Sequence, residues 1–438
     1  MANILLLKKE NIFDGIINNI FFILIPILTL GIYIGFTTYL LCLILLIIRL
    51  FASSKDSVGV FLILFGGIIG GITRSVYPYV PIYGVLIMLF GVMLLWRGIY
   101  PFILKNKDSF LYLFVVYIAL FISYIYGPKD EYGNQKIIEI IINGIFFLFV
   151  FSIINSSSKI NNIEIAQSII LSVISFYVVG IQHFGYMKPE SLVDYEWFRQ
   201  SSNVITNALE VISYQKVGMN ALFALIFFIS NSKNNMKWYN PLSLIFYITC
   251  FHLILSSGAR QAIFGLIVIL LLRYVINIKN ENRLKQIFYF FLSFGFILLV
   301  IYFLQSLDIS FVSKVLDSNG DFNSRTGRGD QFYTSALIMQ EHPLFGVGLG
   351  GFYDYGLSKY PHNIILEIIT ECGFFIFFII LLVVYIYIIK NKVSIKHVTA
   401  NGTYFFLILS VIFVRAMVSG DLTESVALLS GIFVLKNQ

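Results

Sequence analysis

The stretch "GIFFLFVFSIIN", Gly144 to Asn155, contains no charged residue and follows other apolar residues. A run of about 17 to 25 mostly apolar residues is long enough to cross a hydrocarbon core of roughly 30 Å as an α-helix. The stretch "FYFFLSFGFILLVIYFL", Phe288 to Leu304, is a second example. Such runs recur along the chain, so the sequence predicts an all-α, polytopic integral membrane protein.

The composition supports this prediction. Of 438 residues, 58% are hydrophobic and only 12% are charged, with a mean hydropathy of +0.86, whereas soluble domains carry about a quarter charged residues. Cys42, Cys250 and Cys372 lie in or beside apolar stretches without a C-x-x-C pair, which predicts lipid-side or packing residues. The first apolar region predicts two spans and no cleavable signal peptide. We therefore expect residues 1–438 to form a single integral membrane domain.

The pattern predicts about fourteen transmembrane helices, with centres near residues 23, 42, 65, 88, 118, 146, 172, 224, 249, 270, 296, 376, 411 and 429. Most lysines and arginines then fall on the side of the N-terminus, and most acidic residues fall on the other side. Because orientation follows the basic residues of short loops, both termini are predicted to be cytoplasmic. This topology explains the net charge of +7 and the pI near 9.0 without a nucleic-acid partner.

Two loops are too long to be simple connections, and both are predicted on the outer side. They cover residues 183–216 and 306–361. Long structured loops usually carry function. Within the second loop, residues 330–340 are expected to form a short amphipathic helix that ends before Pro343, with Phe332, Ala336 and Met339 on one face.

The segment "HPLFGVGLGGF" follows that helix, and its Gly346, Gly348 and Gly351 have the spacing G-x-G-x-x-G. A dinucleotide loop with this spacing requires a preceding strand and a surrounding βαβ unit. Neither is expected in this chain. The glycines are instead predicted to let the backbone turn tightly beside a substrate cavity, between the arginines upstream and His362 downstream.

Three arginines are candidates for binding a phosphate or diphosphate. Arg325 and Arg328 stand three residues apart before the short helix, where its positive N-terminal end would add to their charge. Solvated loop arginines are the alternative for this pair. Arg260, in "SSGARQAIF", stands at the outer end of a span, where a cation needs a partner or a wet cavity unless it reaches the interface.

His362 opens the span after the second loop and is the candidate base, since a histidine can accept a proton from a hydroxyl near neutral pH. A purely structural histidine is the alternative. Glu367 and Glu371 follow in apolar surroundings, and Glu367 is expected to lie shallow enough to face a water-filled vestibule.

Further candidates lie on the same predicted side. Arg74 and Arg415 serve either in the site or as interfacial anchors, and Arg415 can pair with Asp421 or Glu424. No metal or other cofactor is expected, because the outer loops lack a D-x-D motif and a His/Cys cluster of metal-ligand spacing, and no nucleotide-binding P-loop motif occurs.

In combination these stretches resemble a known family. "SSGARQAIFG", "SRTGRGDQFYTSALIMQEHPLFGVGLGGF" and "YPHNIILEIITECGFF" are similar to the shared region of bacterial O-antigen polymerases (Wzy) and O-antigen ligases (WaaL). The resemblance covers about residues 255–380. The ligase-like pattern is met by His362, Asn363 and Gly373, whereas Ile376 departs from the Gly, Thr or Tyr at its last position.

The resemblance implies a helical glycosyltransferase of the GT-C-like kind in the bacterial inner membrane, with its active site facing the periplasm. Its substrate would be a glycan on undecaprenyl diphosphate, transferred with inversion and without a metal. Arg260 and one or both of Arg325 and Arg328 would match the diphosphate-binding arginines of the family. His362 would match its histidine near the acceptor.

A polymerase that moves the growing glycan onto a new lipid-linked repeat unit is favoured. The alternatives are a ligase that moves finished glycan to lipid A-core, and a flippase or exporter that makes no bond. Polar residues gathered at one face favour an enzyme, because transporter sites tend to lie near the midplane. The polymerase resemblance also implies a chain-length regulator (Wzz-like) and a flippase (Wzx-like) as possible partners, besides membrane lipid.

Overall fold

The computed structural model describes residues 16–29, 36–76, 83–96, 104, 107–156, 160–184, 214–230, 241–257, 259–277, 328–355, 360–391, 393, 403–418 and 420–435. Every regular element in these ranges is a helix, which confirms the all-α prediction. Each predicted span centre in these ranges falls within a helix. The centre near residue 296 lies outside the described residues, as does most of the loop predicted at 183–216.

Three helices in the described ranges are long and apolar enough to cross a membrane, namely Lys107–Tyr126, Glu131–Ile154 and Ile364–Lys390. Further apolar helices of 10–17 residues accompany them. The number of crossings, fourteen by the sequence pattern, stays a prediction.

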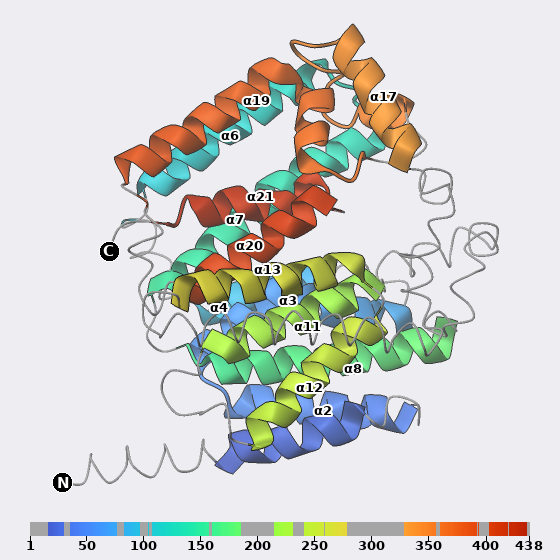
Figure 1. Ribbon diagram of the computed structural model, residues 1–438, viewed down its shortest axis with the longest axis vertical. Helices are drawn as coiled ribbons and strands as arrows, with labels where there is room; N and C mark the ends of the chain where they lie inside the picture. The colour runs from blue at the N-terminus through green and yellow to red at the C-terminus, as the bar shows by residue number, and fades with distance from the viewer. Residues whose placement is uncertain are drawn as a thin grey trace. The chain divides into compact units, whose positions relative to one another are not determined.

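The chain divides into two compact units, each made of segments distant in sequence. The first unit is centred on a long helix, α8, which contacts α2, α3 and α11. In chain order the described helices of this unit are the helix Ile16–Thr29, α2 (Phe36–Ala52), α3 (Lys55–Val76), α4 (Tyr83–Leu94), α8 (Asn162–Phe184), α11 (Tyr214–Ser230), α12 (Pro241–Ser256) and α13 (Arg260–Asn277) (Figure 1).

Helix α8 is buried although it carries several polar side chains. The hydroxyls of Ser168, Ser172 and Ser175 each donate a hydrogen bond to the backbone carbonyl four residues earlier, at 2.8–2.9 Å. Each hydroxyl is thus satisfied within its own helix, which removes most of the cost of burying it. At the start of α8, Glu164 pairs with the buried Arg49 at 3.7 Å and accepts a hydrogen bond from the Ser54 amide at 3.0 Å. The ion pair and the hydrogen bond together hold the turn between α2 and α3 against α8.

The second unit contains the C-terminal helices and one hairpin from the middle of the chain. Helix α19 lies along α6, and α21 packs against α7 (Figure 1). The described helices of this unit are α6 (Lys107–Tyr126), α7 (Glu131–Ser156), α17 (Arg328–Glu341), α18 (Phe352–Tyr355), α19 (Ile364–Lys390), α20 (Thr403–Val418) and α21 (Leu422–Ile432).

The outer faces of α6 and α19 expose large apolar side chains, among them Phe114, Phe121, Phe378 and Leu382. On a soluble surface such a continuous apolar face would favour aggregation, but facing lipid it is stable. The exposed apolar faces therefore agree with the two helices being membrane spans.

The helix predicted at residues 330–340 is present as α17 and ends at Glu341, two residues before Pro343. The apolar face of this helix is not its buried face. Gln331, Ser335 and Ile338 are buried, whereas Phe332 is 49% exposed. Apolar spacing alone does not locate the buried face, because that face carries Gln331 and Ser335 beside Ile338.

Candidate functional site

Helix α19 is broken at Gly373, which divides it into a short head, Ile364–Cys372, and a longer tail, Phe374–Lys390. Gly373 has φ 75° and ψ 169°, a conformation that is essentially restricted to glycine. The break leaves backbone groups on both sides without partners inside the helix. Those groups determine where the preceding loop binds.

The loop after α17 supplies the missing hydrogen bonds. The amides of Val347 and Gly348 donate to the carbonyls of Thr370 and Glu371, at 2.9 and 2.8 Å. In the other direction, the carbonyls of Pro343 and Leu344 accept from the amides of Phe374 and Phe375, at 2.9 and 3.1 Å. The loop residues 343–348 thus replace about one turn of helical hydrogen bonding at the break.

The glycines of the segment "HPLFGVGLGGF" allow this close approach. Gly346, Gly348 and Gly350 all have positive φ. A Cβ atom on Gly348 would lie 2.1 Å from the Cα of Gly127, at the end of α6. The structure contains no strand in the described ranges, so the dinucleotide interpretation is excluded there. The glycines allow backbone to pack on backbone.

A buried ionic cluster lies beside the break. Lys136 of α7 holds Glu367 and Glu371, one turn apart on the head of α19, with its Nζ 2.7 Å from a carboxylate oxygen of each. All three side chains have a relative exposure of 0%. Glu371 Oε2 also accepts a hydrogen bond from the Gly350 amide at 3.0 Å, and its backbone carbonyl accepts one from the Ser123 hydroxyl. The cluster therefore ties α6, α7, the loop and α19 together.

This arrangement corrects the expectation for Glu367, which was to face a water-filled vestibule. Its carboxylate is fully buried against Lys136 instead. Sequence reasoning missed Lys136 altogether, because a lysine near the end of an apolar run resembles an interfacial anchor. The available signal was the pair Glu367 and Glu371, four residues apart in an apolar span, which requires a cation at a similar depth in another span.

His362 and Asn363 immediately precede the head of α19. His362 is half-buried and has φ 56°, the one non-glycine with positive φ in the described part of the chain. Its ring stands edge to face with that of Tyr360, with centroids 4.5 Å apart. Asn363 caps the helix by accepting from the amides of Ile365 and Leu366, at 3.0 and 3.2 Å. The cap and the ring contact together fix the orientation of His362.

The side chain of Asn363 also binds the end of α20. Its amide nitrogen donates to the Met417 carbonyl, near the end of α20, at 3.1 Å. In the following turn Asp421 caps α21 by accepting from the Glu424 amide at 2.9 Å. Arg415 forms an ion pair with Glu424, which confirms one of the pairings expected from the sequence.

Tyr360 interacts electrostatically with the carboxylates of Asp421 and Glu424. Burial raises the pKa of its phenol, and Asp421 and Glu424 raise that pKa further. Because the raised pKa keeps the phenol neutral at physiological pH, Tyr360 remains able to donate a hydrogen bond beside His362.

The dual role of Asn363 can be tested by two substitutions. Asn363→Ala removes both the cap and the amide donor, so we expect a loss of about 1–3 kcal/mol in the free energy of unfolding. Asn363→Asp keeps the cap but not the donor, and should lose about 0.5–1.5 kcal/mol. Thermal unfolding in detergent measures both values. Equal losses in the two variants would show that the cap contributes nothing.

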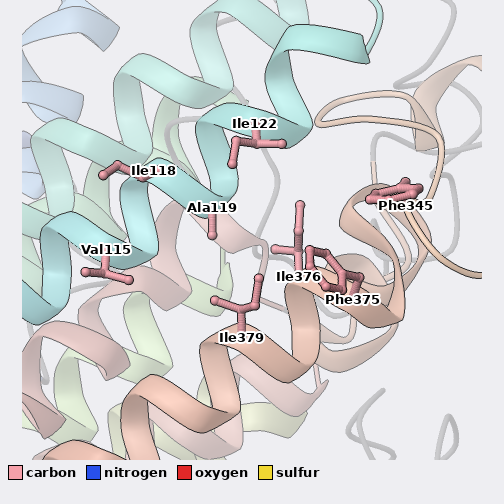
Figure 2. Close-up of a pocket in the computed structure, with 8 residues that line it drawn as sticks. All are labelled: Val115, Ile118, Ala119, Ile122, Phe345, Phe375, Ile376 and Ile379. Atoms are coloured by element: carbon pink, nitrogen blue, oxygen red, sulfur yellow. The ribbon is translucent and has the colours of Figure 1, made fainter.

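A groove between α6 and α19 is entirely apolar. Helix α6 lines one side with Val115, Ile118, Ala119 and Ile122, and α19 lines the other with Phe375, Ile376 and Ile379. Phe345 of the loop lies at one end (Figure 2). Ile376, which departs from the ligase pattern, is buried in this contact. A groove without polar side chains offers no hydrogen-bond partner to a phosphate or a sugar.

The arginine candidates are described to different extents. Arg260 is the first residue of α13, in the first unit, and Arg328 is the first residue of α17, in the second. The turn before Arg260 packs closely on α11, because a Cβ atom on Gly218 would lie 2.5 Å from Ser257 Oγ. Arg74 lies in α3. The side chains of these three arginines, and all of Arg325, lie outside the described residues.

Comparison with known families identifies the region that contains these residues. Residues 245–381 match the family described as O-Antigen ligase. The chain carries the shared region of the O-antigen polymerase and ligase superfamily. No curated protein matches the chain. Together with the apolar helices, the match identifies an integral membrane protein with a role of the O-antigen polymerase or ligase type.

The superfamily region includes α13, α17, α18 and the head of α19. It therefore contains Arg260, Arg325, Arg328, His362 and Glu367. Four further residues lie outside the superfamily region, and packing within the second unit brings them near the site. They are Lys136, Arg415, Asp421 and Glu424. Among the described residues, no group of three His, Cys, Asp or Glu side chains could hold a metal ion.

Proposed function

We propose that this protein is a polysaccharide polymerase of the O-antigen or capsule type. It transfers the growing glycan from undecaprenyl diphosphate onto a new lipid-linked repeat unit, by an inverting reaction that needs no metal. The observation that carries the proposal is His362, held by a cap and a ring contact at the start of α19 within the superfamily region.

The acceptor hydroxyl is the poor partner in this reaction and needs a base and a fixed position. In the proposed step His362 accepts the hydroxyl proton while the acceptor oxygen attacks the anomeric carbon. The bond from that carbon to the diphosphate oxygen breaks, and its electron pair leaves with the diphosphate. Attack opposite the leaving group inverts the anomeric centre.

The diphosphate is a good leaving group and mainly needs its charge stabilised, which arginines can do. Arg260 and Arg328 both stand at the first residue of a helix, where the dipole and the unpaired amides favour an anion over a cation. An anionic ligand would resolve that conflict. This supports Arg260 and one or both of Arg325 and Arg328 as the diphosphate-binding residues, with Arg74 and Arg415 as subsidiary candidates.

The membrane arrangement is part of the proposal. About fourteen helices would cross the bacterial inner membrane in a GT-C-like fold, with both termini in the cytoplasm. The loops at 183–216 and 306–361 would face the periplasm, and residues 255–380 would form the catalytic region. A chain-length regulator and a flippase would work with the enzyme.

A ligase that transfers glycan to lipid A-core is the second candidate. The description of the matching family favours it, as do His362, Asn363 and Gly373 at the positions of the ligase-like pattern. Ile376 argues against it, since a buried isoleucine packed against α6 occupies the last position of that pattern.

The decisive experiment is analysis of lipid-linked and surface glycans from a deletion strain. We expect single repeat units attached to lipid A-core, because polymerisation alone would be lost. Long glycan retained on its lipid carrier would indicate the ligase. Repeat units trapped on the cytoplasmic face would indicate a flippase and overturn both enzymatic candidates.

A further inference from the structure

We propose that Lys136 is a positioning residue for His362, acting through Glu367 and Glu371 on the head of α19. This inference rests on the proposed function of His362. It adds a residue from α7, outside the superfamily region, to the machinery of the site.

The head of α19 needs an external support because the helix is interrupted behind it. At Gly373 the backbone leaves the helical conformation, so the tail of α19 cannot by itself set the direction of the nine residues before the break. The hydrogen bonds from Val347 and Gly348 fix the C-terminal end of the head. Its orientation about its own axis must come from side-chain contacts.

Lys136 supplies charged contacts of this kind, in addition to the hydrogen bond from the Asn363 amide to the Met417 carbonyl. Glu367 and Glu371 are four residues apart and therefore lie on one face of the head. A single ammonium group 2.7 Å from both carboxylates fixes that face against α7. Because all three groups are fully buried, rotating the head would leave charges unpaired in a medium of low polarity, which is strongly unfavourable.

His362 lies two residues before the head and has a backbone conformation that few non-glycine residues adopt. Its ring packs against that of Tyr360, and a rotation of the head would carry it away from the reacting hydroxyl. Glu371 also binds the Gly350 amide, so the same lysine indirectly holds the loop that continues toward Tyr360.

The test uses purified enzyme in lipid nanodiscs, with lipid-linked glycan extracted from the deletion strain as substrate. For Lys136→Met we expect kcat per folded protein to fall by about 100-fold, as for an ångström-scale misplacement of a reacting group. We expect KM to change by less than about threefold, because Lys136 does not touch substrate. The control is Lys390→Met, which removes an exposed lysine that pairs with Asp108 at 3.5 Å in the same unit and should leave both constants unchanged.

A double variant separates positioning from general structural damage. If Lys136 acts through His362, Lys136→Met combined with His362→Ala should be no slower than His362→Ala alone. Multiplied losses would overturn the inference. Full activity of His362→Ala alone would instead overturn the proposed function, so the two failures are distinguishable.

A second variant covers the case in which Lys136→Met does not fold. Lys136→Met with Glu367→Gln removes one positive and one negative charge, and keeps Glu371 on the Gly350 amide. We expect it to insert and to show the same loss of kcat and the same non-additivity with His362→Ala. Wild-type kcat in this variant, or failure of both variants to insert, would overturn the positioning role.

Discussion

Gly373→Ala should lower the free energy of unfolding by about 3–5 kcal/mol, a loss at the upper end for a single substitution. Alanine adopts φ 75° and ψ 169° only under strain. Its Cβ would also lie 2.2 Å from the Leu344 carbonyl oxygen. That oxygen belongs to the backbone of the loop, which is itself hydrogen-bonded to Phe375, so it cannot move aside without breaking the contact.

Thermal unfolding of the detergent-solubilised protein measures this loss. Gly420→Ala is the matched control, because Gly420 has no positive φ and its added Cβ would meet nothing closer than 3.1 Å. It should lose at most about 1 kcal/mol, in the range of ordinary substitutions. If the two variants were equally stable, the break in α19 would not require glycine.

His362→Ala should lower the rate of polymer formation by about 10²–10⁴-fold, the usual contribution of general acid–base catalysis. His362→Gln should be equally slow, since an amide can hold a hydroxyl in place but cannot accept its proton at neutral pH. The rate is measured with lipid-linked repeat units and purified protein. Insertion and thermal stability should stay close to those of the wild type, because His362 is only half-buried.

Tyr360→Phe is the control for this prediction. It keeps the ring that contacts His362 and removes only the hydroxyl, so it should be much faster than either histidine variant.

Arg260→Ala should also abolish most activity, because the diphosphate would be bound more weakly. Full-length polymer from well-inserted His362→Ala or Arg260→Ala would end the assignment of these residues.

Local patterns in the sequence predicted much of the fold and part of the site. Apolar runs located the helices, because a membrane span must be both apolar and continuous. The start of α19 at His362 and Asn363 was also predictable, since capping depends on adjacent residues. The pairing of Arg415 with Glu424 could also be predicted, because the two residues are only nine apart in sequence.

Contacts between distant segments could not be predicted in this way. Lys136 and Glu371 are 235 residues apart, and no local pattern indicates which lysine forms an ion pair with a buried carboxylate. The buried face of α17 could not be predicted from apolar spacing, because Ser335 and Gln331 are buried there. The glycine segment suggested a turn, but its partner, the interrupted backbone at Gly373, became evident only from the structure.

The docking of the loop on α19 also restricts how this region can change in length. The amides of Val347 and Gly348, and the carbonyls of Pro343 and Leu344, each meet one particular group across the break. Inserting or deleting one residue between Leu344 and Val347 would shift every later pairing by one position, much as a slipped strand does in a β-sheet. Substitutions can accumulate at Leu344 and Phe345, whose side chains are exposed. We therefore expect homologous chains to keep the number of residues between Pro343 and Gly348, and the glycine at Gly346, while varying the side chains at Leu344 and Phe345.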